Sequence, residues 1–60
     1  VKIGDVFYYE RNGRYVTVYA NCYNPKCWCC SVEEMNEDGE YEVSEHKLFM
    51  EYELLHFERR

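Results

Sequence analysis

The sequence lacks any long hydrophobic run, and this absence excludes several classes of protein. Its 60 residues are 47% hydrophobic, but no stretch approaches the ~20 consecutive apolar residues that a transmembrane helix needs. The length allows one domain, which we place at residues 1–60. It excludes a multidomain enzyme, and it disfavours a nucleotide-binding α/β fold because one βαβ unit alone takes about 30 residues.

Basic residues are scarce in the second half of the chain. Residues 33–58 contain ten acidic residues and one lysine, and the whole chain carries a net charge of −5. Nucleic-acid backbones are bound by Lys and Arg side chains that neutralise phosphates, so this composition argues against direct nucleic-acid binding. It favours another protein with a basic surface as the partner, and no membrane partner is expected.

The N-terminal residues 1–5 lack the apolar segment of a secretory signal, so we expect a cytoplasmic protein. This matters for the four cysteines, at positions 22, 27, 29 and 30. Their spacing differs from the Cys-x2-Cys pairs of common zinc sites, and we expect no metal or other cofactor. Reduced thiols are the simplest interpretation. A disulfide from Cys22 to Cys27 or Cys30, or a zinc-binding structural mini-domain, is the alternative.

Turn signals divide the chain into short segments. Asn12-Gly13, Asn24-Pro25 and Asp38-Gly39 are typical turn sequences, and the first favours a tight hairpin. The segments between them are rich in Val, Tyr, Phe and Trp, and they predict strands at about residues 5–11, 14–22, 28–35 and 40–44. A short strand or turn over residues 47–49 and then one or two helical turns are expected to follow.

Alternation along the strands predicts which side chains lie inside. A two-residue loop at Asn12-Gly13 places Arg11 opposite Arg14. Three further pairs are then expected in the first hairpin: Tyr9 with Val16, Phe7 with Val18, and Asp5 with Ala20. Three are expected in the second: Val18 with Val32, Ala20 with Cys30, and Cys22 with Trp28. In this register Cys22 and Cys30 point inward and Cys29 points outward, and Tyr41 and Val43 supply the inward residues of the fourth strand.

Three segments within about residues 3–50 share an order with a known fold. They are Ile3-Gly4-Asp5-Val6-Phe7-Tyr8-Tyr9, then Glu37-Asp38-Gly39-Glu40-Tyr41-Glu42-Val43, then Leu48-Phe49. This order resembles SH3-like and Tudor-like small β-barrels, including small bacterial and phage proteins of that fold. With the C-terminal helical turns, it implies a mainly β chain: a small SH3-like barrel of four to five antiparallel strands and a short C-terminal helix. Such domains are mostly non-enzymatic binding modules.

Tyrosine is the residue type that points to a function. Tyr8, Tyr15 and Tyr19 fall on the outer side of the first hairpin, beside Glu33 and Met35 of the next strand. Tyrosine rings bury a large surface area with little loss of side-chain conformational entropy, and their hydroxyl groups still form hydrogen bonds. Tyrosine is therefore enriched at interfaces. We call these five residues the tyrosine face and expect them to bind a protein partner. A core role for the rings, or a cage for a methylated cation, is the alternative.

The acidic residues suggest how such a partner is selected. Glu37, Asp38, Glu40 and Glu42 form an expected acidic surface that favours a basic partner. Alternatively, this surface imitates nucleic acid and inhibits a host protein, or it repels edge-to-edge strand pairing. The sequence has no Ser-His-Asp arrangement, and so small a barrel lacks room for a substrate cleft of about 300 Å³ or more. We therefore expect no enzymatic activity and no catalytic residues.

Overall fold

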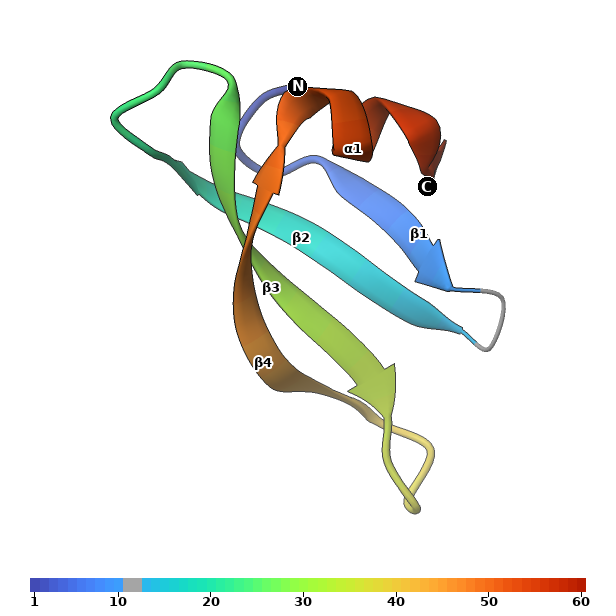
Figure 1. The fold of residues 1–60 in the computed structure, drawn as a ribbon. Coiled ribbons are helices and arrows are strands. Elements are labelled where there is room, and N and C mark those ends of the chain that lie inside the picture. Colours follow the sequence, from blue (N-terminus) through green and yellow to red (C-terminus); the bar gives the residue numbers. More distant parts are fainter. Residues whose placement is uncertain (11–12) are drawn as a thin grey trace.

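The computed structural model describes residues 1–10 and 13–60, which form one antiparallel sheet and a short helix (Figure 1). The elements in chain order are β1 (Val6–Glu10), β2 (Arg14–Asn21), β3 (Cys27–Met35), β4 (Tyr41–Met50), α1 (Glu51–His56) and β5 (Glu58–Arg59). The expected mainly β architecture, with antiparallel strands and a short C-terminal helix, is therefore confirmed. In the described residues, no helix is long and apolar enough to cross a membrane.

The sheet is open, with the strand order β4-β3-β2-β1-β5. Within the described ranges its edges, β4 and β5, do not pair, so the closed barrel that the sequence predicted is not formed. The two edge strands differ greatly in length, since β4 has ten residues and β5 only two. The molecule is elongated, with extents of 37 × 18 × 15 Å, and the β3–β4 hairpin projects away from the helix (Figure 1).

One face of the sheet carries the core. Alternating positions on the strands place Phe7, Val16, Val18, Cys30 and Val32 on this face, all of them buried. The helix α1 covers the same core with Leu54, which is 0% exposed. The helix begins after Met50, whose backbone N–H donates to Oε1 of Glu53 at 3.0 Å. This bond satisfies one of the amides that a helix start leaves without a partner.

The register of the first hairpin differs from the expected one by two residues. Phe7 pairs with Val16 and Val6 with Thr17, so the expected pairs of Tyr9 with Val16, Phe7 with Val18 and Asp5 with Ala20 are wrong. An irregularity between Tyr8 and Glu10 leaves Tyr9 as an extra residue. The bulge directs the Tyr9 ring against the Phe49 and Phe57 rings, each with its centroid at 5.5 Å.

The tight turn expected at Asn12-Gly13 lies partly outside the described residues, as does the expected pairing of Arg11 with Arg14. Gly13 itself has φ +88°, a conformation that an L side chain rarely adopts. The observed pairs place Glu10 opposite Arg14.

A second irregularity changes the pairing of β2 with β3. Val16 pairs with Val32 and Val18 with Cys30, and beyond the extra residue Tyr19, Ala20 pairs with Cys29. The expected pairs of Val18 with Val32, Ala20 with Cys30 and Cys22 with Trp28 are therefore wrong. The bulge also reverses the predicted orientation of Cys22. Its thiol lies beside that of Cys29, on the side of the sheet opposite the buried Cys30.

The fourth strand is continuous from Tyr41 to Met50, so the expected strand at 40–44 and the short strand at 47–49 belong to one element. The prediction that Tyr41 and Val43 point into the core is wrong, since their exposed fractions are 42% and 50%. The cause is a third irregularity, where Ser44 is the extra residue and Val43 pairs with Glu33. The Ser44 hydroxyl donates to the carbonyl oxygen of Val32 at 3.2 Å.

Candidate interaction surface

The side of the sheet opposite the core carries the tyrosine face. The β1–β2 and β2–β3 pairings place Tyr8 opposite Tyr15 and Tyr15 opposite Glu33, so these three side chains lie side by side on neighbouring strands. Tyr19 and Met35 lie farther along the strands, and both are exposed. The structure therefore brings all five predicted residues to one side of the sheet. The two-residue error in register left this grouping unchanged, because a shift of two positions keeps every side chain on its side.

Three tyrosine rings form a continuous aromatic row. The Tyr15 ring centroid lies 5.0 Å from that of Tyr8 and 5.0 Å from that of Tyr41, both in tilted or edge-on arrangements. Such geometries are favoured by the ring quadrupole. A hydrogen bond with Tyr15 is the main cause that raises the pKa of the Tyr41 hydroxyl, so the two phenol groups also interact. Tyr15 is thus the centre of the row.

A cation covers the central ring. The guanidinium carbon of Arg60 lies 4.5 Å from the Tyr15 ring centroid, within the range of a cation–π interaction. Because this chain's own arginine is bound there, the geometry does not favour a cage for a methylated cation at Tyr15. The row is better described as a packed support within the tyrosine face.

Tyr19 lies apart from the row and has a different environment. Its ring centroid is 5.6 Å from that of His46, and its side chain is 50% exposed. Between Tyr19 and the row, the carboxylate of Glu33 accepts hydrogen bonds from the hydroxyls of Thr17 at 3.0 Å and Ser31 at 3.4 Å. This network fixes the orientation of Glu33 and leaves a polar patch flanked by aromatic rings.

The sequence prediction missed three residues of this surface. Tyr41 was expected inside, and neither His46 nor Arg60 was expected on this surface. The Ser44 bulge turns Tyr41 toward the tyrosine face, while Arg60 arrives there because β5 pairs with β1. The cation–π contact of Arg60 comes from the far end of the sequence, so no local pattern could have indicated it.

The acidic residues cluster at the β3–β4 turn, at the end of the molecule away from α1. Glu37, Asp38, Glu40 and Glu42 are all exposed. The turn is ordered by Asn36, whose side-chain oxygen accepts the backbone N–H groups of Asp38 at 2.9 Å and Glu40 at 3.0 Å. This Asx-type turn orders the backbone that carries the carboxylates.

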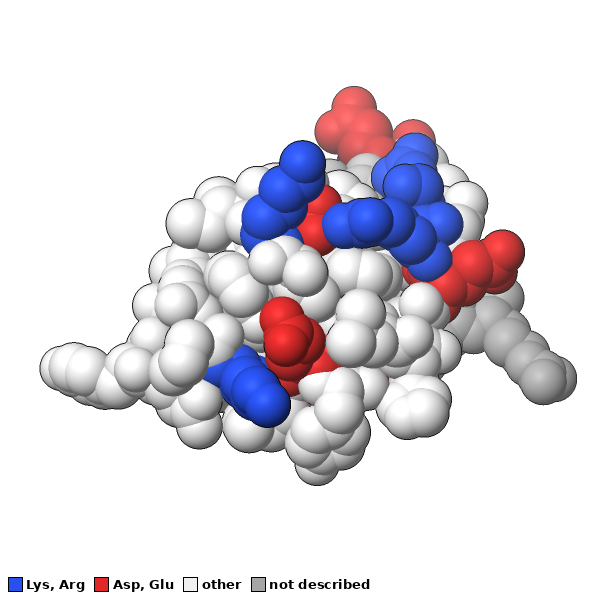
Figure 2. Space-filling model, turned by 90° about the horizontal axis from the view of Figure 1, so that it is seen from above, with Lys and Arg blue, Asp and Glu red and all other residues white. Residues whose placement is uncertain are grey.

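Two of the acidic side chains lie directly opposite each other. Glu34 of β3 pairs with Glu42 of β4, and like charges at such positions repel and destabilise the sheet. The guanidinium of Arg14 lies 3.4 Å from the Glu34 carboxylate and relieves part of this repulsion. At the α1 end, by contrast, Lys and Arg side chains lie among Asp and Glu side chains (Figure 2). The charge of the molecule is therefore uneven along its long axis.

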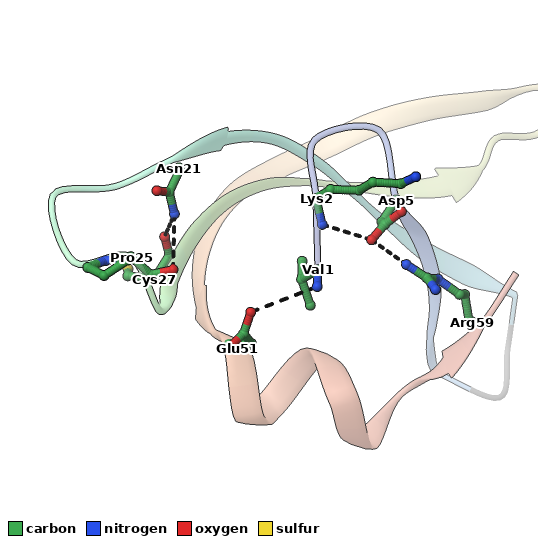
Figure 3. Close-up of polar contacts among 8 residues, drawn as sticks. All are labelled: Val1, Lys2, Asp5, Asn21, Pro25, Cys27, Glu51 and Arg59. Atoms are coloured by element: carbon green, nitrogen blue, oxygen red, sulfur yellow. Dashed lines mark hydrogen bonds and ion pairs between the residues drawn. The ribbon is translucent and has the colours of Figure 1, made fainter.

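Asp5 is a buried carboxylate with a structural role. Its side chain is 8% exposed and accepts the backbone N–H of Lys2 at 2.9 Å and a guanidinium N–H of Arg59 (Figure 3). The bond from Lys2 and the charge of Arg59 lower the pKa of Asp5, although burial opposes the shift. The ion pair links the start of β1 to β5.

A cavity of about 160 Å³ lies between α1, β1 and β5, lined by Val1, Phe7, Leu55, Phe57 and Arg59. Sites for small molecules usually measure about 300–1,000 Å³. The cavity is therefore smaller than a typical substrate site, and the candidate function rests on the open sheet surface.

Comparison of the chain with protein-family models, curated proteins and solved structures finds no match. The interpretation of the surface therefore rests on its own geometry.

Proposed function

We propose that this chain is a non-enzymatic protein-binding module that binds its partner through the tyrosine face. The observation that carries the proposal is the exposure of large side chains on one side of the sheet: 50% for Tyr19, 56% for Met35 and 39% for Tyr8. The core and α1 occupy the other side. An uncovered sheet face with aromatic rings around a polar centre has the composition of a protein–protein interface.

The surface is also held in place before a partner arrives. Tyr15 is fixed between two rings and a guanidinium, and Glu33 is fixed by two hydroxyl groups. Side chains that are already ordered lose little entropy on binding, so more of their contact energy contributes to affinity. Tyr19 and Met35 then supply exposed apolar area on either side of this ordered centre.

The charge of the acidic turn supports the proposal that the partner has a basic surface. Glu34 and Glu42 lie opposite each other in a pairing that costs stability, and three further exposed carboxylates, those of Glu37, Asp38 and Glu40, lie nearby. A partner with Lys and Arg side chains would relieve the repulsion and would be attracted over a distance, which speeds association. A second candidate rests on this same observation: the turn imitates a phosphate backbone and occupies a basic nucleic-acid site on a host protein.

A relationship to SH3-like or Tudor-like domains forms part of the proposal. It is supported by the meander order of β1 to β4 and by three irregularities, at Tyr9, Tyr19 and Ser44, which bend and twist the strands as in small barrels. The open sheet would represent an unclosed form of that architecture.

The test of the tyrosine face is capture of binding proteins from the source cells by wild type and by the variant Tyr19→Ser/Met35→Ser. The matched control is Tyr23→Ser/Leu55→Ser, because both of its residues are exposed but lie in the β2–β3 turn and on α1. We expect at least a tenfold loss of the captured protein for the first variant and no change for the control. Equal capture by both variants would show that the tyrosine face is not the interface.

The charge reversal Glu37→Lys/Asp38→Lys/Glu40→Lys tests the acidic turn. If the acidic turn only steers the partner, the charge reversal should slow association and reduce the salt dependence of the association rate. The Tyr19→Ser/Met35→Ser variant should then still have the larger effect on affinity. If the turn imitates nucleic acid, the reversal abolishes binding and the Tyr19 variant does not. Unchanged binding at low salt would remove any role for the turn.

A further inference from the structure

The β2–β3 turn brings three thiols to one side of the sheet. Cys22 follows the end of β2, while Cys27 and Cys29 are alternate residues of β3 and point the same way. The turn is held by the Asn21 side chain, whose amide donates to the carbonyl oxygens of Cys27 at 2.9 Å and Pro25 at 3.4 Å (Figure 3). The backbone N–H of Cys22 also donates to the Cys27 carbonyl at 3.0 Å.

Two of these thiols are close enough to react with each other. The Sγ atoms of Cys22 and Cys29 lie 3.1 Å apart. A disulfide bond is about 2.05 Å long, so an approach of about 1 Å would join the two sulfurs. Both residues are half-buried, so a small oxidant reaches them from the open side of the sheet.

The fourth cysteine has a different environment. Cys30 is 0% exposed in the core, on the opposite side of the sheet, and burial raises the pKa of its thiol to about 11. A disulfide between Cys22 and Cys30 would have to pass through the sheet, so this expected alternative is wrong. In the described residues, no three His, Cys, Asp or Glu side chains are arranged to hold a metal ion. The geometry therefore favours a dithiol over a zinc site.

We propose that Cys22 and Cys29 form a reversible disulfide by exchange with a low-molecular-weight disulfide, for example glutathione disulfide. This inference is independent of the proposed function. The bond would tie the end of β2 to β3, beside the exposed Leu48 that pairs with Cys29.

The exchange takes place in two balanced steps. The Cys29 thiol loses its proton to solvent, and its sulfur attacks one sulfur of glutathione disulfide; the S–S bond breaks and one glutathione thiolate leaves. The Cys22 sulfur, after loss of its own proton, then attacks Cys29 in this mixed disulfide, and the second glutathione thiolate leaves. Both thiolates take up protons. Two protein thiols are oxidised, and one small disulfide is reduced to two thiols.

The environment of Cys22 accounts for the order of the steps. The hydrogen bond with Cys29 is the main cause that raises the pKa of Cys22 to about 12, with burial and Cys27 as further causes. The Cys22 thiolate is therefore rare while Cys29 is a free thiol. A hydrogen bond raises the pKa of Cys22 when the Cys22 thiol donates its proton to the Cys29 sulfur. Once Cys29 has formed the mixed disulfide, its sulfur is a weaker acceptor, so Cys22 ionises more readily and lies next to the bond that it must attack.

The test begins with the reduced protein in a buffer of glutathione and glutathione disulfide. We expect intact mass to fall by about 2 Da as two hydrogens leave, with no glutathione retained. Cleavage after Lys26 by trypsin and after Trp28 by chymotrypsin places Cys22, Cys27 and Cys29 on separate fragments. Tandem mass spectrometry of the linked fragment then separates Cys29 from Cys30. The expected link joins Cys22 to Cys29.

Three variants complete the test. Cys29→Ser and Cys22→Ser should each abolish the mass loss, whereas the matched control Cys27→Ser should retain it. The two cysteines are seven positions apart, and closing a loop of this size should raise the melting temperature of the oxidised form by about 10–20 °C. A link from Cys22 to Cys27, retained glutathione on a single cysteine, four thiols that stay reduced, or a bound zinc ion would each overturn the proposal.

Discussion

Tyr15 and Tyr19 have the same side chain on the same sheet face, but they should differ in their effect on stability. Replacing Tyr15 by alanine removes two ring pairs with centroid distances of 5.0 Å and the contact with Arg60 at 4.5 Å. Each ring pair contributes about 0.5–1.5 kcal/mol and an exposed cation–π contact about 0.5–1 kcal/mol. We therefore expect Tyr15→Ala to lower the free energy of unfolding by about 1.5–4 kcal/mol.

Tyr19→Ala removes a single contact with His46 from a side chain that is half exposed, so its expected cost is below about 1 kcal/mol. Tyr23→Ala is the control for the chemistry of the substitution, because Tyr23 is fully exposed in a turn; its expected effect is within about 0.5 kcal/mol. The differences in unfolding free energy between the three variants distinguish Tyr15, which supports the surface, from Tyr19, whose ring is available to a partner.

The assay is urea unfolding followed by the fluorescence of Trp28, which is the single tryptophan and is buried in the core. A protein of this size loses about 1 kcal/mol of stability per molar urea, so Tyr15→Ala should move the midpoint down by about 1.5 M or more. Equal midpoints for Tyr15→Ala and Tyr19→Ala would refute the reasoning, because the aromatic row would then contribute no more than an isolated surface ring.

Three further predictions concern the framework that holds this surface. Leu54→Ala should cost about 2–5 kcal/mol in the same unfolding assay, because Leu54 is fully buried and attaches α1 to the core; a loss below about 1 kcal/mol would contradict that role. Asn36→Ala should cost about 1–2 kcal/mol, since two backbone N–H groups lose their acceptor, and amide exchange at the β3–β4 turn should accelerate. The lowered pKa of Asp5 adds stability that is present above its ordinary pKa of 3.8 and is lost as the pH falls through the lower folded value. The urea midpoint of wild type should therefore drop below about pH 4, and Asp5→Asn should show a smaller drop; parallel pH profiles would argue against this ion pair.

The sequence was sufficient to predict the first three strands and the face to which Tyr8, Tyr15 and Tyr19 belong. Alternation of Val and Phe with Tyr and Thr determines the two sides of β1 and β2. A register error of two residues leaves each of these side chains on the predicted side of the sheet. The helix was predictable from the apolar spacing that ends at His56. These features depend on local pattern, which the sequence contains directly.

The three bulges were not predictable. Tyr9, Ser44 and Tyr19 are extra residues whose positions are determined by packing across the sheet, such as the contacts of the Tyr9 ring with Phe49 and Phe57. Because each bulge shifts the register by one residue, the errors accumulated where the chain continued past them. The contact between Cys22 and Cys29 was therefore missed, as was the position of Tyr41 on the tyrosine face.

A photo-crosslinking residue placed at a single position tests most directly whether the tyrosine face binds a partner. Benzoylphenylalanine at position 19 adds a reactive ring where Tyr19 is half exposed, and the same residue at position 23 serves as the control in the β2–β3 turn. After irradiation in an extract of the source cells, we expect a discrete protein adduct from position 19 and none from position 23. The same adducts from both positions, or an adduct from position 23 alone, would contradict the assignment of the tyrosine face as the binding surface.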